Sequence, residues 1–144
     1  MDRLGFCNLM EQAKTCSNLT PSEISFSMKM LMPTLRRFEK GNHNFSMTKV
    51  MEYLKVLSAK LIVHKGSSKK IFTDYEQLIS WIILERKKSF SQRTLAEAVG
   101  MSYVMLARVE SQKSNLTIDV FLKIVDILGC SIEIKPTISN KNSL

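Results

Sequence analysis

The chain has 144 residues, of which 44% are hydrophobic and 24% charged, with five glycines and three prolines. This composition excludes a disordered or collagen-like chain and is typical of a helix-rich globular protein. The sequence has no run of 18 apolar residues and no signal-like start, so we expect a cytoplasmic protein that does not span a membrane.

The net charge of +8 is unevenly distributed. Residues 1–71 hold 12 basic and 5 acidic side chains, whereas residues 72–144 hold 9 and 8. A basic excess makes a polyanion a natural partner. The three cysteines, at positions 7, 16 and 130, have no metal-ligand spacing, which indicates reduced thiols rather than a disulfide framework or a zinc site.

Apolar residues recur at helical spacing through the first part of the chain. Thr20 is suited to cap a helix that has Pro21 at its first position. We predict helices near 3–16, from Pro21, near 31–39 and near 46–58, then a strand over 60–64. Residues 65–73, KGSSKKIFT, are predicted to be an exposed linker.

The second part of the chain shows the same order of elements. Ser91, Ser102 and Thr117 are suited to cap helices, and Gly100 and Gly129 to end them. We predict helices near 74–87, 92–98, 103–110 and 118–128, a strand over 131–135 and a frayed polar tail over 136–144.

A shift of 71 residues superimposes the apolar positions of residues 19–64 on those of residues 90–135 without a gap. Ile24 then falls on Leu95, and Leu35 falls on Leu106. Few of the paired residues are identical, so the burial pattern is what repeats. A fixed period of this kind indicates one structural unit built twice. We predict a first unit over residues 1–64 and a second over 74–135.

Residues 92–109 have the pattern of a helix-turn-helix motif. Ala96 supplies the small side chain needed where two steeply crossing helices approach, and Gly100 tolerates the positive φ of the tight turn. Leu106 and Val109 face the core, which leaves Tyr103 and its neighbours on the free face of the third helix.

The segment FSQRTLAEAVGMSYVMLARVESQKSNLTIDVFLKIVDILGCSIEI resembles the Cro/repressor (Xre) family of bacterial and phage DNA-binding proteins, which have a lambda-repressor-like fold. The resemblance implies that the third helix enters the major groove, and that an Arg at position 108 could pair with guanine. It also implies phosphate contacts from the start of the second helix and from the loop after the third. The implied DNA-binding residues are Gln92, Ser102, Tyr103, Val104, Met105, Arg108, Ser111, Lys113 and Ser114. A solvated helix face is the alternative for Tyr103 and Arg108.

One position departs from the family pattern. The family often has an arginine seven residues before the glutamine, where it pairs with the glutamate that ends the third helix. Here Glu85 occupies that position and Arg86 follows it. We therefore expect Glu110 either to pair with Arg86 or to form no such ion pair.

The first unit departs further, with Pro21, Ser25 and Lys29 in place of Gln92, Ala96 and Gly100. A lysine in a left-handed turn costs roughly 1 kcal/mol. Its third helix has no polar cap, yet basic residues surround it, which indicates a diverged unit that retains phosphate affinity. A merely solvated basic surface is the alternative. The candidate DNA contacts are Met32, Thr34, Arg36, Arg37, Lys40 and His43.

Lone strands are unstable, so we expect the strands 60–64 and 131–135 to pair with each other. The predicted fold is mainly α: two tandem lambda-repressor-like units, each of four helices and a C-terminal strand, forming an intramolecular pseudo-dimer. We expect a monomer with internal pseudo-two-fold symmetry, and a dimer remains open.

The pattern contains no paired nucleophile and base and no phosphate loop, so we expect neither catalysis nor a cofactor nor a metal. The predicted function is sequence-specific binding of double-stranded DNA as a transcriptional regulator, expected to be a repressor, with recognition helices near 31–39 and 102–110 in successive major grooves. The alternative is an antitoxin-like or adaptor module whose first unit binds a protein partner.

Overall fold

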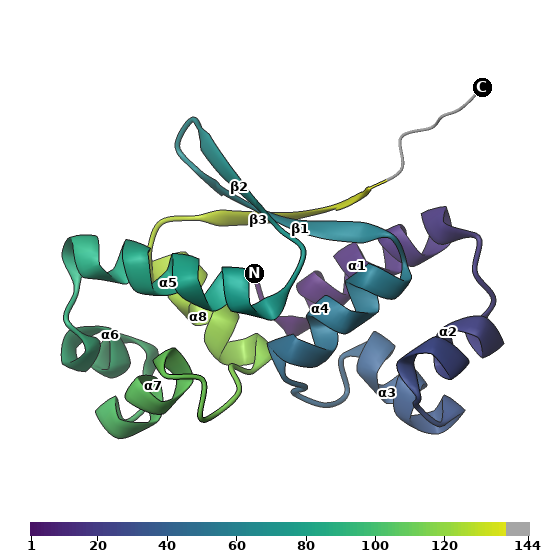
Figure 1. The fold of residues 1–144 in the computed structure, drawn as a ribbon, viewed down its shortest axis with the longest axis horizontal. Helices are drawn as coiled ribbons and strands as arrows, with labels where there is room; N and C mark the ends of the chain where they lie inside the picture. Colours follow the sequence, from purple (N-terminus) through teal and green to yellow (C-terminus); the bar gives the residue numbers. More distant parts are fainter. Residues whose placement is uncertain (138–144) are drawn as a thin grey trace.

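The computed structural model describes residues 1–137, which form eight helices and a three-stranded sheet (Figure 1). We call α1–α4 with β1 the N-terminal half, and α5–α8 with β3 the C-terminal half. The elements are α1 (Arg3–Ser17), α2 (Pro21–Met28), α3 (Met32–Lys40), α4 (Met47–Val56), β1 (Ala59–Lys65), β2 (Ser68–Phe72), α5 (Tyr75–Ser89), α6 (Gln92–Val99), α7 (Tyr103–Glu110), α8 (Ile118–Ile127) and β3 (Ser131–Pro136).

The structure corrects the linker predicted over residues 65–73. These residues are mostly exposed, but Lys65 ends β1 and residues 66–72 form the turn and second strand of a β-hairpin, in which β2 pairs antiparallel with β1. Gly66 supplies a φ of 60° in the turn, and Phe72 is buried against Trp81 with ring centroids 5.6 Å apart. The burial of Phe72 anchors a segment whose composition resembles that of a loop.

The tail predicted over residues 136–144 is only partly within the described residues. Pro136 ends β3, and the backbone N–H of Thr137 donates to the carbonyl of Ser58 at 2.6 Å. The start of the predicted tail is thus bonded to the sheet, and residues 138–144 lie outside the described residues.

Capping side chains explain where the helices begin. A Ser, Thr or Asp side chain accepts a hydrogen bond from the first turn at the start of every helix in residues 1–137 except α3. Thr20 and Glu23 form a complete capping box at α2. Helix α3 has Leu31 at its N-cap without a side-chain bond, as its sequence predicts.

Left-handed residues end helices at equivalent positions in the two halves. Lys29 follows α2 with φ 56°, and Gly100 follows α6 with φ 76°. The same 71-residue shift relates two further pairs, which are Gly41 with Gln112 and Ser58 with Gly129. The backbone path therefore repeats even where only one member of each pair is a glycine.

The sheet has the order β2-β1-β3, and the predicted pairing of the strands 60–64 and 131–135 is present. The register of this pairing follows the 71-residue shift. The central pair is Ile62 with Glu133, and the shift carries one of these residues onto the other. The flanking pairs Leu61↔Ile134 and Val63↔Ile132 exchange under the same shift. An antiparallel ladder with this register has a local two-fold axis at its centre.

The halves also meet at a second place, which we call the second crossing, and there too the paired residues are related by the 71-residue shift. Ser46 and Thr117, which the shift relates, form an isolated antiparallel bridge. The N–H of Met47 donates to the carbonyl of Leu116 at 2.6 Å, and the N–H of Ile118 donates to the carbonyl of Phe45 at 3.0 Å. These two hydrogen bonds exchange when the halves are exchanged, so the halves meet twice with the same local symmetry.

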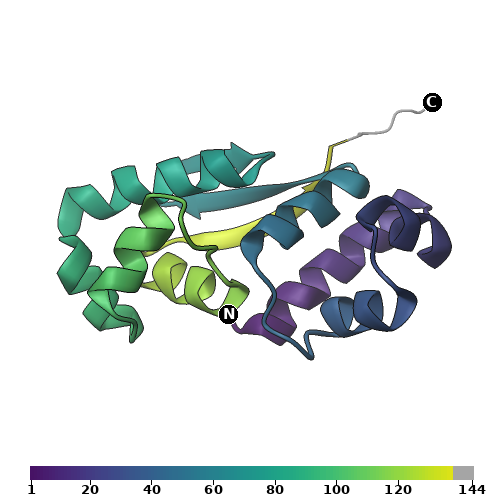
Figure 2. The same cartoon turned by 60° about the horizontal axis from the view of Figure 1, so that its bottom comes forward.

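The halves share one continuous hydrophobic core instead of forming separate cores. Phe6 of α1 lies edge-on to Phe121 of α8, with ring centroids 6.4 Å apart. Figure 2 shows α1, α4 and α8 in the middle of the molecule, with α2 and α3 at one end and α6 and α7 at the other. Within residues 1–137, no helix has the length and apolar content needed to cross a membrane.

We expect Lys29→Gly to raise the free energy of unfolding by roughly 0.5–1 kcal/mol. Glycine removes the cost of a side chain in the left-handed region, and this gain exceeds the added entropy of the unfolded chain. Lys29→Ala removes the same charge but keeps the strained φ, so it should change stability little. Gly100→Ala should destabilise by about 1 kcal/mol. Urea denaturation measures all three, and a loss of stability in Lys29→Gly would contradict the assigned strain.

Candidate nucleic-acid interface

Helices α6 and α7 form a helix-turn-helix arrangement. Ala96 is buried where the two helices meet, and Gly100 turns the chain between them. Leu106 and Val109 are buried, which fixes α7 to the core through one face. The opposite face of α7 is free, as its apolar spacing predicts.

A buried ion pair joins α5 to the end of α7. Arg86 donates from Nε to Glu110 Oε2 at 2.5 Å and from Nη2 to Glu110 Oε1 at 2.9 Å. Both side chains are only 7% exposed, and Nη1 of Arg86 also donates to the carbonyl of Phe90 at 3.1 Å. The sequence left open whether Glu110 pairs with Arg86, and the structure shows that it does.

Glu85, at the position where an arginine is common, turns away from Glu110 and binds two lysines. Lys88 Nζ lies 2.6 Å from one carboxylate oxygen, and Lys65 Nζ lies 3.0 Å from the other. Hydrogen bonds from Lys88 and then Lys65 hold the pKa of the Glu85 carboxyl below its usual range. Because Lys65 ends β1, this pair ties the hairpin to α5.

Gln92, at the start of α6, belongs to the same network as Arg86. Its Nε2 donates to Glu110 Oε1 at 2.8 Å. A primary amide nitrogen has two N–H groups, so one donor is left for a further acceptor. The structure therefore places Gln92 between the buried pair and the surface at the helix start.

The first turn of α7 is exposed and apolar. Tyr103 is 42% exposed, Val104 61% and Met105 43%. The Ser102 hydroxyl accepts from the N–H of Met105 at 3.1 Å and so acts as the helix cap. The structure brings these four predicted residues together at one tip of the molecule.

Arg108 lies one turn later and is held by the following loop. Its Nε donates to the Ser114 hydroxyl at 3.0 Å, and its Nη2 donates to the carbonyl of Lys113 at 3.2 Å. The Ser111 hydroxyl donates to the carbonyl of Arg108 at 3.2 Å. The four predicted residues 108, 111, 113 and 114 thus form one hydrogen-bonded group at the end of α7.

The sequence prediction missed Arg93. Its guanidinium carbon lies 4.6 Å from the centroid of the Tyr103 ring, which is cation–π geometry. Both residues are exposed, so a cation accompanies the apolar tip of α7. Its signal in the sequence is a lone Arg next to Gln92 at the start of α6.

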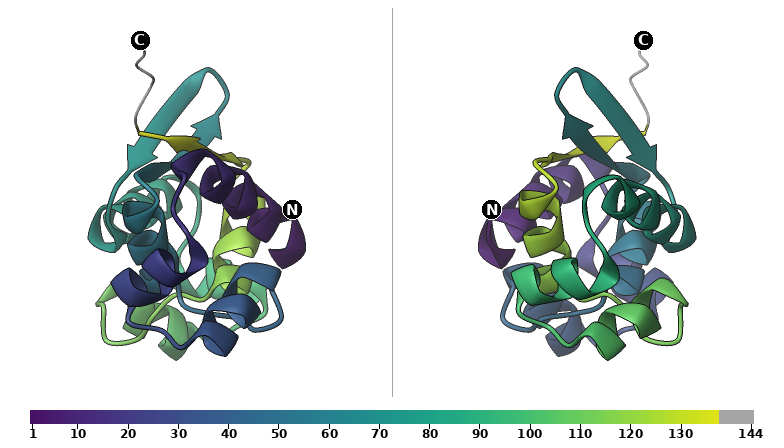
Figure 3. Two further views of the ribbon diagram at one scale, coloured as in Figure 1. Left: turned by 90° about the vertical axis from the view of Figure 1, so that its right-hand side faces the viewer. Right: turned by 90° about the vertical axis from the view of Figure 1, so that its left-hand side faces the viewer.

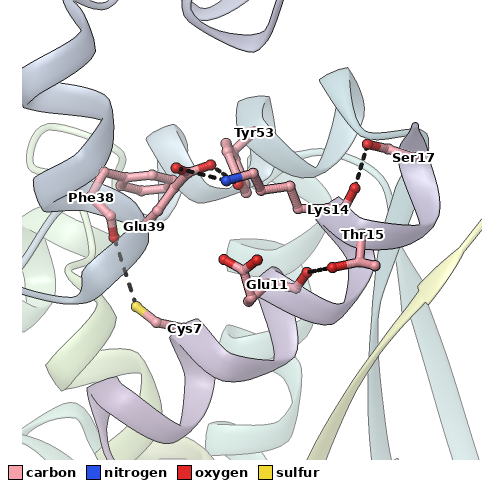
Figure 4. Close-up of polar contacts among 8 residues, drawn as sticks. All are labelled: Cys7, Glu11, Lys14, Thr15, Ser17, Phe38, Glu39 and Tyr53. Atoms are coloured by element: carbon pink, nitrogen blue, oxygen red, sulfur yellow. Dashed lines mark hydrogen bonds and ion pairs between the residues drawn. The ribbon is translucent and has the colours of Figure 1, made fainter. Parts of the chain in front are cut away.

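The N-terminal half holds its equivalent glutamate, Glu39, with different partners (Figure 4). Lys14 Nζ lies 3.3 Å from Glu39 Oε1, and the hydroxyl of Tyr53 donates to Glu39 Oε2. Burial, together with Glu39, raises the pKa of Tyr53 well above its usual range. The last turn of α3 is therefore anchored to α1 and α4, as that of α7 is anchored to α5.

The basic residues predicted around α3 are at the surface. Arg36, Arg37 and Lys40 are exposed, and Arg37 Nη2 lies 3.4 Å from the Thr34 hydroxyl. His43 is exposed and packs its ring against Phe45, with centroids 4.8 Å apart. Met32 and Thr34 are half-buried at the start of the helix.

The helix pairs α2–α3 and α6–α7 lie on the same side of the molecule (Figures 1 and 3). Figure 1 shows α3 and α7 along the lower edge, at opposite ends, and the sheet along the upper edge. The end views of Figure 3 place α2 and α3, and likewise α6 and α7, on the side away from the sheet. Both exposed helices therefore face one common surface.

A small helix pair joined by a tight turn, with its second helix exposed, defines a helix-turn-helix domain. Residues 82–135 match the helix-turn-helix family model, which begins in α5 and ends in β3. A search of curated proteins and a search of solved structures each returned no match. The match supports a helix-turn-helix domain over residues 82–135, and residues 1–81 lie outside the matched range.

We expect Glu110→Ala to cost about 3–5 kcal/mol of stability, because it leaves the Arg86 guanidinium buried without its counter-charge. Arg86→Met combined with Glu110→Leu should recover most of that loss, since no buried charge remains. Glu97→Ala, on the exposed face of α6, is the matched control and should stay within about 0.5 kcal/mol of the parent chain. Chemical denaturation measures each, and an equal loss in the single and double variants would contradict this account.

Proposed function

We propose that this chain is a sequence-specific double-stranded DNA-binding regulator of transcription, built as a single-chain pseudo-dimer of two helix-turn-helix units. The observation that supports it best is the pair of two-fold crossings, one in the β1–β3 ladder and one at Ser46 and Thr117. Equivalent units related by a two-fold axis present their exposed helices as a homodimer does. Helices α3 and α7 would then enter successive major grooves about 34 Å apart.

The proposed contacts of the second unit divide into two kinds. The start of α7 approaches base edges through Tyr103, Val104 and Met105. Arg108 follows one turn later, and the loop does not use the N–H groups of its Nη1. Ser102 lies at the helix cap. Gln92, Ser111, Lys113, Ser114 and the additional Arg93 contact phosphates and set the orientation on the duplex.

The first unit contributes mainly charge. Lys29, Arg36, Arg37, Lys40 and His43 are exposed around α3 and neutralise phosphates. Met32 and Thr34 at the start of α3 face the bases. Since the two helices differ at almost every exposed position, the preferred site is an imperfect palindrome or two unlike half-sites. We propose repression as the mode, because occupancy of two adjacent grooves alone blocks access to a promoter.

A specific observation supports a second candidate function. Phe26 is 86% exposed and Leu31 is 77% exposed, and the shift of 71 residues places Glu97 and Ser102 at these positions in the second unit. An apolar surface of this kind on the first unit fits an adaptor or antitoxin-like module that binds a protein partner. Stoichiometric co-purification of a partner whose binding is lost in Phe26→Ser would favour this candidate.

Selection of bound sequences from random duplex DNA tests the principal proposal. We expect two unlike half-sites centred one helical turn apart. The logarithm of the association constant should fall linearly with the logarithm of the salt concentration. Lys113→Ala should reduce the salt slope by about one and weaken all sequences alike. Lys69→Ala, in the hairpin on the side away from α3 and α7, should leave the slope unchanged (Figure 1). Equal effects of the two substitutions would contradict the proposed interface.

The oligomeric state provides a separate test. Because β1 pairs with β3 of the same chain, we expect sedimentation equilibrium to give the 16.5 kDa monomer at all concentrations, and one chain per two-half-site duplex. A tight dimer with strands exchanged between chains would contradict the pseudo-dimer.

A further inference from the structure

The tips of both exposed helices are apolar where the proposed function brings them to base edges. In α7 the tip consists of Tyr103, Val104 and Met105, and in α3 it consists of Leu31, Met32 and Pro33. Surface residues of this kind are common singly, but three consecutive ones at each of two helix starts on one face are unusual. We name these two groups the α7 tip and the α3 tip.

The tips offer few groups that could form hydrogen bonds to bases. Neither LMPTL at the start of α3 nor SYVML at the start of α7 contains Asn, Gln, Arg, Lys, Asp or Glu, the side chains that make paired contacts to guanine, adenine or cytosine. The Ser102 hydroxyl caps α7, and the Thr34 hydroxyl accepts from Arg37. The donors left in these two segments are single hydroxyl groups, those of Ser102, Thr34 and Tyr103, and none of them can make a paired contact to a base.

Arg108 lies one turn beyond the α7 tip. Its Nε and one N–H of Nη2 donate to the 113–114 loop. The second N–H of Nη2 and the two N–H groups of Nη1 remain for a paired contact to one guanine. Such a contact would lie one turn after the α7 tip, and the tip itself is apolar.

Charge around the tips favours DNA over an apolar protein as the occupant. Arg93 lies over the ring of Tyr103, and Lys113 and Arg108 are exposed at the far end of α7. Arg36, Arg37 and Lys29 are exposed around the α3 tip. An apolar centre between cations matches a duplex, in which the phosphates flank the groove and the groove floor can be apolar.

Thymine is the base that presents an apolar group in the major groove, its C5 methyl. Packing an apolar side chain against guanine or cytosine would cover polar edges without satisfying them, which costs free energy. We propose that both half-sites are recognised through thymine methyl groups, by Val104 and Met105 in one groove and by Leu31 and Met32 in the other. This inference rests on the proposed function and specifies the class of DNA sequence that it requires.

The test compares thymine with uracil, which lacks only the methyl group, in the duplex recovered by selection. Replacing a contacted thymine by deoxyuridine should weaken binding about four-fold, the value of one buried methyl. Placing 5-methylcytosine, which presents a methyl at the same place in the groove, in a cytosine-substituted site should restore part of the loss. Deoxyuridine outside the half-sites should have no effect, and the salt slope should not change, because no phosphate contact is altered.

Variants assign the methyl contacts to residues. The double variant Val104→Ala and Met105→Ala should bind duplexes with thymine or uracil in one half-site with equal affinity. The double variant Leu31→Ala and Met32→Ala should show the same loss of preference in the other half-site. Lys113→Ala is the matched control, since it should weaken binding while keeping the preference for thymine. Val104 and Leu31 are mostly exposed, and thermal melting of each variant checks that the fold persists.

The outcomes separate this inference from the proposal beneath it. Failure to bind any duplex in a salt-dependent manner would overturn the proposed function. Salt-dependent, sequence-selective binding with equal affinity for thymine and uracil duplexes would overturn the methyl inference alone. Selection of guanine or cytosine opposite both tips would do the same.

Discussion

The structure depends on one constraint, which is that its two halves meet at equivalent residues. The central pair of the β1–β3 ladder is Ile62 with Glu133, and the second bridge is Ser46 with Thr117. Four helices and a strand follow in the same order in each half, whereas β2 occurs once within residues 1–137. A slip of one residue in the ladder would turn Leu61 and Val63 out of the core, which strongly favours this register.

The last turns of α3 and α7 are fixed to the rest of the protein by different side-chain contacts. Each of α3 and α7 has in its last turn a glutamate that is tied to the body of the protein. Glu110 binds Arg86 and Gln92, whereas Glu39 binds Lys14 and the hydroxyl of Tyr53. The cation comes from the first helix of each half, α1 or α5, but the partners differ in type. Both carboxylates hold the last turn of a helix. The halves have thus diverged in chemistry while keeping the positions that fix the two helices.

The sequence was most informative where local pattern decides structure. Apolar spacing and capping residues predicted the helices, and the instability of lone strands predicted the β1–β3 pair. Strand β2 was missed because one buried residue, Phe72, anchors a segment rich in Gly, Ser and Lys. The stacking of Arg93 on Tyr103 could not be predicted either, since it depends on the crossing angle of α6 and α7. The choice of Arg86 by Glu110 likewise depends on which face of α5 is buried, which the spacing left ambiguous.

Joining the two halves in one chain changes what each half must do. In a homodimer both recognition helices are identical, and affinity is limited by the concentration at which subunits associate. Here the crossings are intramolecular, so the two helices are always presented together and neither is constrained to match the other. The α7 half retains a compact group of polar residues after its helix, and the α3 half combines exposed basic residues with exposed Phe26 and Leu31. Under the function proposed above, the two crossings would fix the spacing between two unlike half-sites while each half sets its own preference.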